Sequence, residues 1–196
     1  MMAKARPVQG LSSQAPLIDN VHLIVKARLD DLYQWSGFVD QPYAVHELHN
    51  LRIAAKRLRY TLELFAAVLS AQTPTVIEEL TRLQDMLGEL HDHDVVIALL
   101  RLCLGGQDSG RAYEDMLLQA GKGKKGRKGD IALPPALVAT LLNPQTLPDA
   151  TERYGLECLL SSLQAQREKL YANFRQYWYY LQGRDFRREV LATLNA

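Results

Sequence analysis

The chain has 196 residues and a formal net charge of +1, with 47% hydrophobic and 23% charged residues. This size suits one domain, or one domain with an insertion, and the hydrophobic fraction is enough for a packed core. A net charge so close to zero excludes a protein that attracts anions through its overall charge, so any such preference must come from local clusters of cations. The N-terminus has no apolar signal segment, and the most apolar run, 95–104, is too short to cross a bilayer. We therefore expect a cytoplasmic protein that has no membrane contact.

The first half of the chain shows helical spacing of its apolar residues and no alternation typical of β-strands. Residues 1–16 lack periodicity and contain Pro, Gly, Gln and Ser, which predicts a disordered N-terminal tail. Helices are expected at about 16–35, at 45–69 and from Thr75, as N-cap, to 104.

The second half begins with a segment of different composition, at about 106–150. Its stretch GKGKKGRKGD combines lysines and glycines and cannot pack into a core, which predicts a flexible basic insertion. Helical periodicity returns from about 149, and Gly183 precedes a short last helix at 186–194. The sequence thus predicts an all-α protein, an antiparallel bundle of about four long helices plus short ones, forming a single domain over 17–196.

The segment 45–69 carries an unusual concentration of cations. One face of this helix gathers polar and cationic side chains, namely His49, Arg52, Lys56, Arg59 and Tyr60, with Arg57 at its edge. Like charges one turn apart repel each other, and no acid lies between positions 52 and 59. Two interpretations follow. The cations form a solvated surface paired with acids of neighbouring helices, or they form a ladder roughly 15 Å long that holds a linear polyanion.

Two motifs in this part of the chain resemble those of a known family. The first is His49-x-x-Arg52-Ile53-x-x-Lys56-Arg57-Leu58-Arg59-Tyr60, and the second is Leu83-x-x-x-Leu87-Gly88-Glu89-Leu90-x-Asp92. Together they closely resemble the repeat of the CHAD family, the conserved histidine α-helical domain. The resemblance is good over 45–100 and weaker in the first helix and the last third. It implies a helical bundle with a basic cleft that binds inorganic polyphosphate, association with polyphosphate granules, and neither catalysis nor a cofactor.

The resemblance also implies which residues bind polyphosphate. They lie on three helices and are Lys26, His49, Arg52, Lys56, Arg57, Arg59, Arg167 and Arg175. Three others, His22, Tyr60 and Asp92, are expected to support them, and Asp92 would fix the rotamers of the arginines. Family members carry the basic helix twice, whereas one full copy is visible here. This predicts either a shortened cleft or a homodimer that completes it.

The run His91-Asp92-His93-Asp94 suggests an alternative function. Imidazoles and carboxylates are metal ligands, and adjacent His and Asp are similar to those of HD-type metal-dependent phosphohydrolases. However, neighbouring helical residues diverge by 100°, so four consecutive side chains cannot all face one metal. The residues that usually follow an HD pair are also absent. We therefore favour binding without a metal over hydrolysis.

The aromatic residues between 171 and 180 bear on the type of ligand. They are not interleaved with enough cations to indicate an RNA-stacking surface. Nucleic acid is therefore not the expected partner, and the resemblance to the CHAD family implies inorganic polyphosphate instead.

Overall fold

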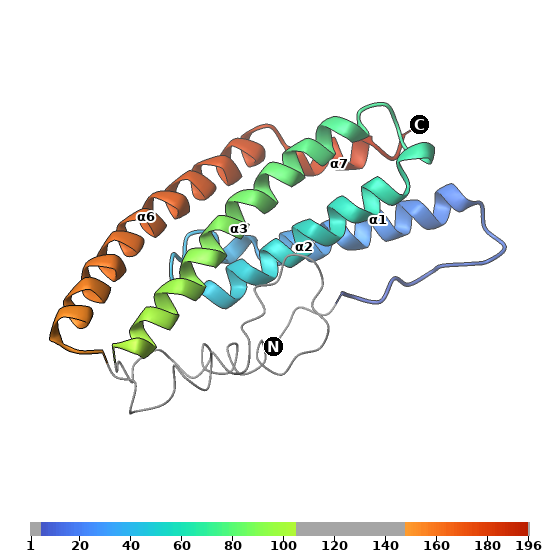
Figure 1. The fold of residues 1–196 in the computed structure, drawn as a ribbon. Coiled ribbons are helices and arrows are strands. Elements are labelled where there is room, and N and C mark those ends of the chain that lie inside the picture. The colour runs from blue at the N-terminus through green and yellow to red at the C-terminus, as the bar shows by residue number, and fades with distance from the viewer. Residues whose placement is uncertain (1–4, 105–147, 196) are drawn as a thin grey trace. The chain divides into compact units, whose positions relative to one another are not determined.

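A computed structural model describes residues 5–104 and 148–195 of the chain. Within these ranges the chain forms helices and no strand, so the predicted all-α class is confirmed (Figure 1). The elements are α1 (Leu17–Tyr33), η1 (Ser36–Phe38), α2 (Val45–Leu64), η2 (Ala66–Val68), α3 (Thr73–Cys103), α6 (Ala150–Gly183) and α7 (Phe186–Ala192), where η denotes a 3-10 helix. Two boundaries were wrong. The helix expected over 45–69 ends at Leu64 and is followed by η2. Helix α3 already includes Thr73, so Thr75 lies within the first turn and is not the N-cap.

The chain divides into two compact units. The first contains residues up to 91 and from 170 onward, and the second contains residues 92–169, so that α3 and α6 contribute to both. The single domain over 17–196 stays a prediction.

The predicted basic insertion at about 106–150 lies, apart from its last residues, outside the described residues. No helix in the described ranges has the length and apolarity needed to span a membrane.

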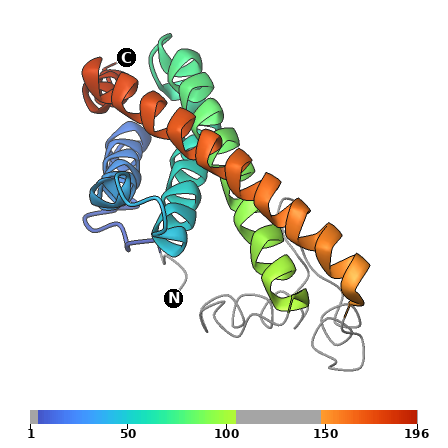
Figure 2. The same ribbon diagram turned by 90° about the vertical axis from the view of Figure 1, so that its left-hand side faces the viewer.

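The core of the first unit follows from apolar residues spaced three and four apart. On α2, the apolar residues at this spacing are buried from Leu48 to Leu62, and Phe65 is partly buried beyond the end of the helix. Helix α1 lies beside α2 and contributes Val21, Val25 and Leu29 to the same core (Figures 1 and 2). Burying one such aliphatic side chain stabilises the fold by roughly 1.5–3 kcal/mol. This packing fixes which face of α2 remains for other contacts.

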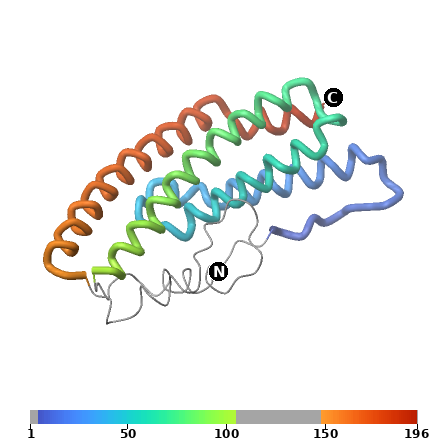
Figure 3. The backbone as a smooth tube through the Cα atoms, viewed as in Figure 1, coloured from blue at the N-terminus to red at the C-terminus, as the bar shows by residue number. Residues whose placement is uncertain are grey.

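The stretch before α1, whose course Figure 3 shows, contacts that helix through Arg28. The Arg6 side chain donates to Gln34 Oε1 at 2.7 Å, and the Arg28 side chain donates to the carbonyl oxygen of Arg6 at 2.9 Å. Arg28 also pairs with Asp31, which is only 2% exposed. Arg28 therefore compensates a buried carboxylate. Part of the predicted disordered tail is thus in contact with α1.

The chain turns between α6 and α7 at Asp185. This residue has a left-handed backbone conformation, with φ of 55°, and its side chain accepts a hydrogen bond from the backbone N–H of Arg188. Asp tolerates this conformation better than most residues and is a favoured N-cap. The turn lets Phe186 and Val190 of α7 enter the core of the first unit.

Candidate functional site

The cationic face of α2 lies along α3. Arg52 is 8% exposed and His49 is 9% exposed, which is unusual for cationic or titratable residues on an amphipathic helix. The His49 ring lies 4.4 Å from the His91 ring of α3, measured between centroids. One turn further along, a Cβ atom on Gly88 would lie 3.7 Å from Arg52 Nε. We call this line of contact between α2 and α3 the seam.

The two contacts also fix the register of the seam. Each step of three residues forward on α2 corresponds to three residues backward on α3, as expected for antiparallel helices. His49 and Arg52, two positions of the predicted ladder, therefore lie against successive turns of α3.

The outer cations of the ladder are less buried. Lys56, Arg57 and Arg59 are of intermediate exposure, whereas the Tyr60 ring is 48% exposed. The Arg59 guanidinium lies 4.8 Å from the centroid of the Tyr60 ring, and the Lys56 ammonium lies 5.8 Å from it. Both distances suit a cation–π interaction, so the aromatic ring holds two cations near each other at the surface. The role of Tyr60 as a supporting residue of a binding site stays a prediction.

The seam also contains polar atoms without a hydrogen bond among the described residues. Arg59 Nε and Gln84 Oε1 are both buried and have no such partner. Arg59 pairs through its NH1 atom with Glu63, at 3.4 Å on the same helix. Because buried polar atoms are normally satisfied, this end of the seam retains hydrogen-bonding capacity.

Arg167 is placed differently from the α2 cations. It lies in the second unit, is buried, and donates through Nε to Asp94 Oδ1 at 2.7 Å. Burial raises the pKa of the Asp94 carboxyl group, although the guanidinium acts in the opposite direction. The structure therefore shows Arg167 as one half of a buried ion pair, and its role as a polyphosphate ligand stays a prediction.

Arg175 also forms an ion pair with a carboxylate, and this pair lies on the surface of the first unit. Its Nε donates to Asp40 Oδ1 at 2.6 Å, and the Tyr179 hydroxyl donates to Asp40 Oδ2 at 2.6 Å. These hydrogen bonds, from Tyr179 first and then from Arg175, lower the pKa of Asp40. This cluster attaches α6 to the segment before α2. Ligand binding by Arg175 likewise stays a prediction.

The remaining predicted site residues, Lys26, His22 and Asp92, differ in their exposure to solvent. Lys26 is exposed on α1 and His22 is partly buried. Helix α1 packs beside α2, but contact of His22 or Lys26 with a ligand stays a prediction. Asp92 is exposed, and its role in positioning arginines is likewise untested.

The run His91–Asp94 does not converge on one point. The His91 ring contacts His49, Asp92 is exposed, and Asp94 is held by Arg167. Among the described residues, no group of three or more His, Cys, Asp or Glu side chains is arranged to hold a metal ion. The sequence interpretation missed the contact of His91 with His49. Gly88, three residues before His91, was the available signal, because a glycine within a helix indicates close approach of a neighbour.

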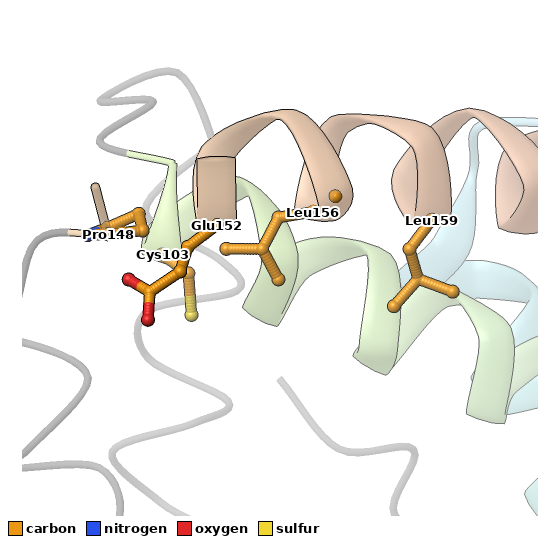
Figure 4. A pocket seen from close by; sticks show the side chains of 6 residues that line it. Cys103, Pro148, Glu152, Leu156 and Leu159 are labelled. Carbon is orange, nitrogen blue, oxygen red and sulfur yellow. The ribbon is translucent and has the colours of Figure 1, made fainter. Parts of the chain in front are cut away.

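The second unit contains an open pocket of about 530 Å³ (Figure 4). It lies where α3 ends and α6 begins, and it is lined by Cys103, Pro148, Glu152, Gly155, Leu156 and Leu159. The lining residues that the structure describes are mainly apolar, with one carboxylate and no cation among them. They offer nothing that suits a polyanion, and none of them belongs to the seam.

The seam thus defines a class: an all-α protein with a cationic face set against a neighbouring helix. The model of the CHAD domain family matches residues 19–101, which include α2 and most of α1 and α3. This match confirms the resemblance to the CHAD family for that part of the chain. No curated protein and no solved structure matches the chain.

Proposed function

We propose that this chain binds inorganic polyphosphate along the seam and catalyses no reaction on it. The observation that carries the proposal is the position of the α2 cations. Their spacing repeats turn by turn, and all of them lie within the segment that matches the CHAD family. The family's ligand, polyphosphate, is a linear chain of negative charges. A linear row of cations suits such a ligand better than it suits one compact phosphate.

Each cation would contribute in a different way. Arg52 and Arg59 offer paired N–H donors that match phosphate oxygens, and Lys56 offers a mobile point charge. Arg57, at the edge of the face, adds charge. His49 donates a stronger hydrogen bond when it is protonated. Tyr60 keeps Lys56 and Arg59 together.

Binding of this kind is coupled to salt concentration. A polyanion releases condensed counterions when protein cations replace them, so affinity falls steeply as salt rises. We expect a linear decrease of log K against log salt for polyphosphate. Free orthophosphate, which has no row of charges, should bind far more weakly.

In the cell, such a protein would be cytoplasmic and associated with polyphosphate granules. A second copy of the chain could supply further cations, because only one full basic helix is present in the sequence. Both statements extend the proposal. The alternative, hydrolysis by His91 and Asp92, has no favourable geometry among the described residues, since His91 packs on His49 and Asp92 is exposed.

The test is a titration of the purified protein with long-chain polyphosphate, duplex DNA and orthophosphate at several salt concentrations. We expect polyphosphate to bind more tightly than DNA at equal concentration of charge, and orthophosphate to bind least. Equal affinity for DNA and polyphosphate would contradict the proposal, because general attraction to polyanions would then explain the binding. Release of orthophosphate from polyphosphate in the presence of Mg²⁺ or Mn²⁺ would contradict the noncatalytic part.

A further inference from the structure

The row of cations on α2 is followed, on the same face of the helix, by a carboxylate. At about 100° of rotation per residue, Glu63 lies within about 40° of each cation of this row, namely Arg52, Lys56 and Arg59. The Glu63 side chain is 40% exposed, and its Oε1 atom lies 3.4 Å from Arg59 NH1. A polyanion that follows the row beyond Arg59 therefore meets a negative charge.

The stability of α2 does not explain an acid at this position. Glu63 lies in the last turn of the helix, which ends at Leu64, and the C-terminal end of a helix carries a partial negative charge that disfavours a carboxylate. The ion pair also has the less favourable direction, because the acid follows the base by four residues instead of preceding it. The pair of Arg59 and Glu63 therefore contributes little to the folding of α2.

Arg59 is also held in place by contacts other than Glu63. Its side chain is only 18% exposed, its Nε atom is buried, and its guanidinium lies 4.8 Å from the centroid of the Tyr60 ring. Burial and the cation–π contact thus restrict the guanidinium on their own. The carboxylate of Glu63 adds a negative charge beside NH1, an atom that could otherwise donate to a phosphate oxygen.

We propose that Glu63 competes with polyphosphate for the Arg59 guanidinium and so limits the affinity of this end of the row. This inference rests on the proposed function, since it names a residue that tunes the affinity of the same site. A phosphate that binds Arg59 NH1 has to displace the carboxylate. Direct repulsion between phosphate and the exposed Glu63 is reduced by water and salt, so the main effect of Glu63 passes through Arg59.

The experiment is titration of the full chain with long-chain polyphosphate at several salt concentrations, for wild type and Glu63→Gln. The matched control is Glu157→Gln. Glu157 accepts from Arg153 Nε at 3.0 Å, so the control removes the same charge from an ion pair of the same spacing, and it lies in the second unit. Denaturant unfolding first establishes that each variant is folded.

We expect Glu63→Gln to raise polyphosphate affinity about two- to fivefold, the range in which ion pairs near the surface contribute, and Glu157→Gln to change it less than about 1.5-fold. The plot of log K against log salt should become steeper by roughly 0.7–0.9 in Glu63→Gln, as for one further contact between a cation and a phosphate. In an Arg59→Gln background, Glu63→Gln should change affinity less than about 1.5-fold, because the group for which it competes is absent.

Three results would overturn the inference and leave the proposed function intact. Unchanged affinity of Glu63→Gln would show that no competition takes place, and lower affinity would show that Glu63 positions Arg59 for the ligand. An equal gain in Glu157→Gln, or a gain that persists without Arg59, would show that charge in general is responsible. Absence of polyphosphate binding by the wild type would overturn both the inference and the proposed function.

Discussion

At the scale of single residues, Gly88 determines how Arg52 lies against α3. A Cβ atom at position 88 would lie 3.7 Å from Arg52 Nε, which is an ordinary van der Waals distance. A methyl group therefore fits there, whereas a longer side chain would occupy the space of the guanidinium. The size of residue 88 thus controls the geometry of a candidate ligand.

This geometry predicts opposite results for two substitutions. Gly88→Ala should raise the free energy of unfolding by about 0.5–1 kcal/mol, because alanine is the better helix former, and should keep polyphosphate affinity. Gly88→Leu should leave a folded protein but lower affinity several-fold by displacing Arg52. Denaturant titration and polyphosphate binding of both variants provide the check. Equal affinity of the two variants would show that the position of Arg52 does not matter for binding.

The buried pair of Asp94 and Arg167 leads to a second prediction, which concerns the stability of variants at these two positions. Removing one partner leaves the other charge buried, so Asp94→Asn or Arg167→Met should lower the free energy of unfolding by about 3–5 kcal/mol. Replacing both, as Asp94→Leu with Arg167→Met, should restore stability to within about 1 kcal/mol of wild type. The raised pKa of Asp94 agrees with this, because burial outweighs the attraction of the guanidinium. A double variant as unstable as the single variants would contradict it.

At the scale of elements, α6 is attached to α3 by a cluster around Glu79. The Tyr177 hydroxyl hydrogen-bonds to the Glu79 carboxylate, and Arg184 NH1 donates to Glu79 Oε1 at 2.7 Å. Burial alone would raise the pKa of Glu79, but the hydrogen bonds from Tyr177 and Arg184 outweigh it and lower the pKa below its ordinary value of 4.5. The ionised carboxylate is therefore the form that stabilises the first unit.

The sign of this shift gives a pH prediction. A lowered pKa in the folded state means that the stabilisation is present above pH 4.5 and is lost as the pH falls through the lower, folded-state pKa. Glu79→Gln should therefore reduce the free energy of unfolding by about 1–2 kcal/mol at pH 7, and the difference from wild type should shrink toward pH 3. Urea unfolding at both pH values measures it, with exposed Glu78→Gln as the control. A difference that is constant with pH would show that the carboxylate charge is not involved.

The part of the fold that the sequence could predict is the part that helical periodicity determines. The apolar residues of α2, from Leu48 to Leu62, repeat at spacings of three and four, and burial in the structure follows them. The start of α3 was less predictable, because Thr73 and Thr75 are both reasonable helix-start residues. Pairings between distant helices were missed, namely His49 with His91 and Asp94 with Arg167. Periodicity gives the face of a helix but not the register against its neighbour.

At the scale of the whole molecule, a net charge of +1 requires that attraction to polyanions be local. Arginines of α6, of α7 and of the turn between them illustrate this, because several are matched with acids of the first unit. Arg175 pairs with Asp40, Arg184 with Glu79 and Arg187 with Asp30. Each of these ion pairs joins two segments that are far apart in the sequence. The cations of the seam are spaced along one face of α2, and the account makes this face responsible for binding.

The most direct test of this central claim compares two double variants that remove the same charge. Arg52→Ala with Arg59→Ala removes two cations from the seam, and Arg101→Ala with Arg153→Ala removes two exposed cations from the second unit. Polyphosphate affinity is measured for both and for wild type at one moderate salt concentration, after each variant is shown to be folded. The account predicts a loss of at least tenfold for the seam variant, which corresponds to about 1.4 kcal/mol, and less than a twofold change for the other. Equal losses in the two variants, or no loss in the seam variant, would contradict it.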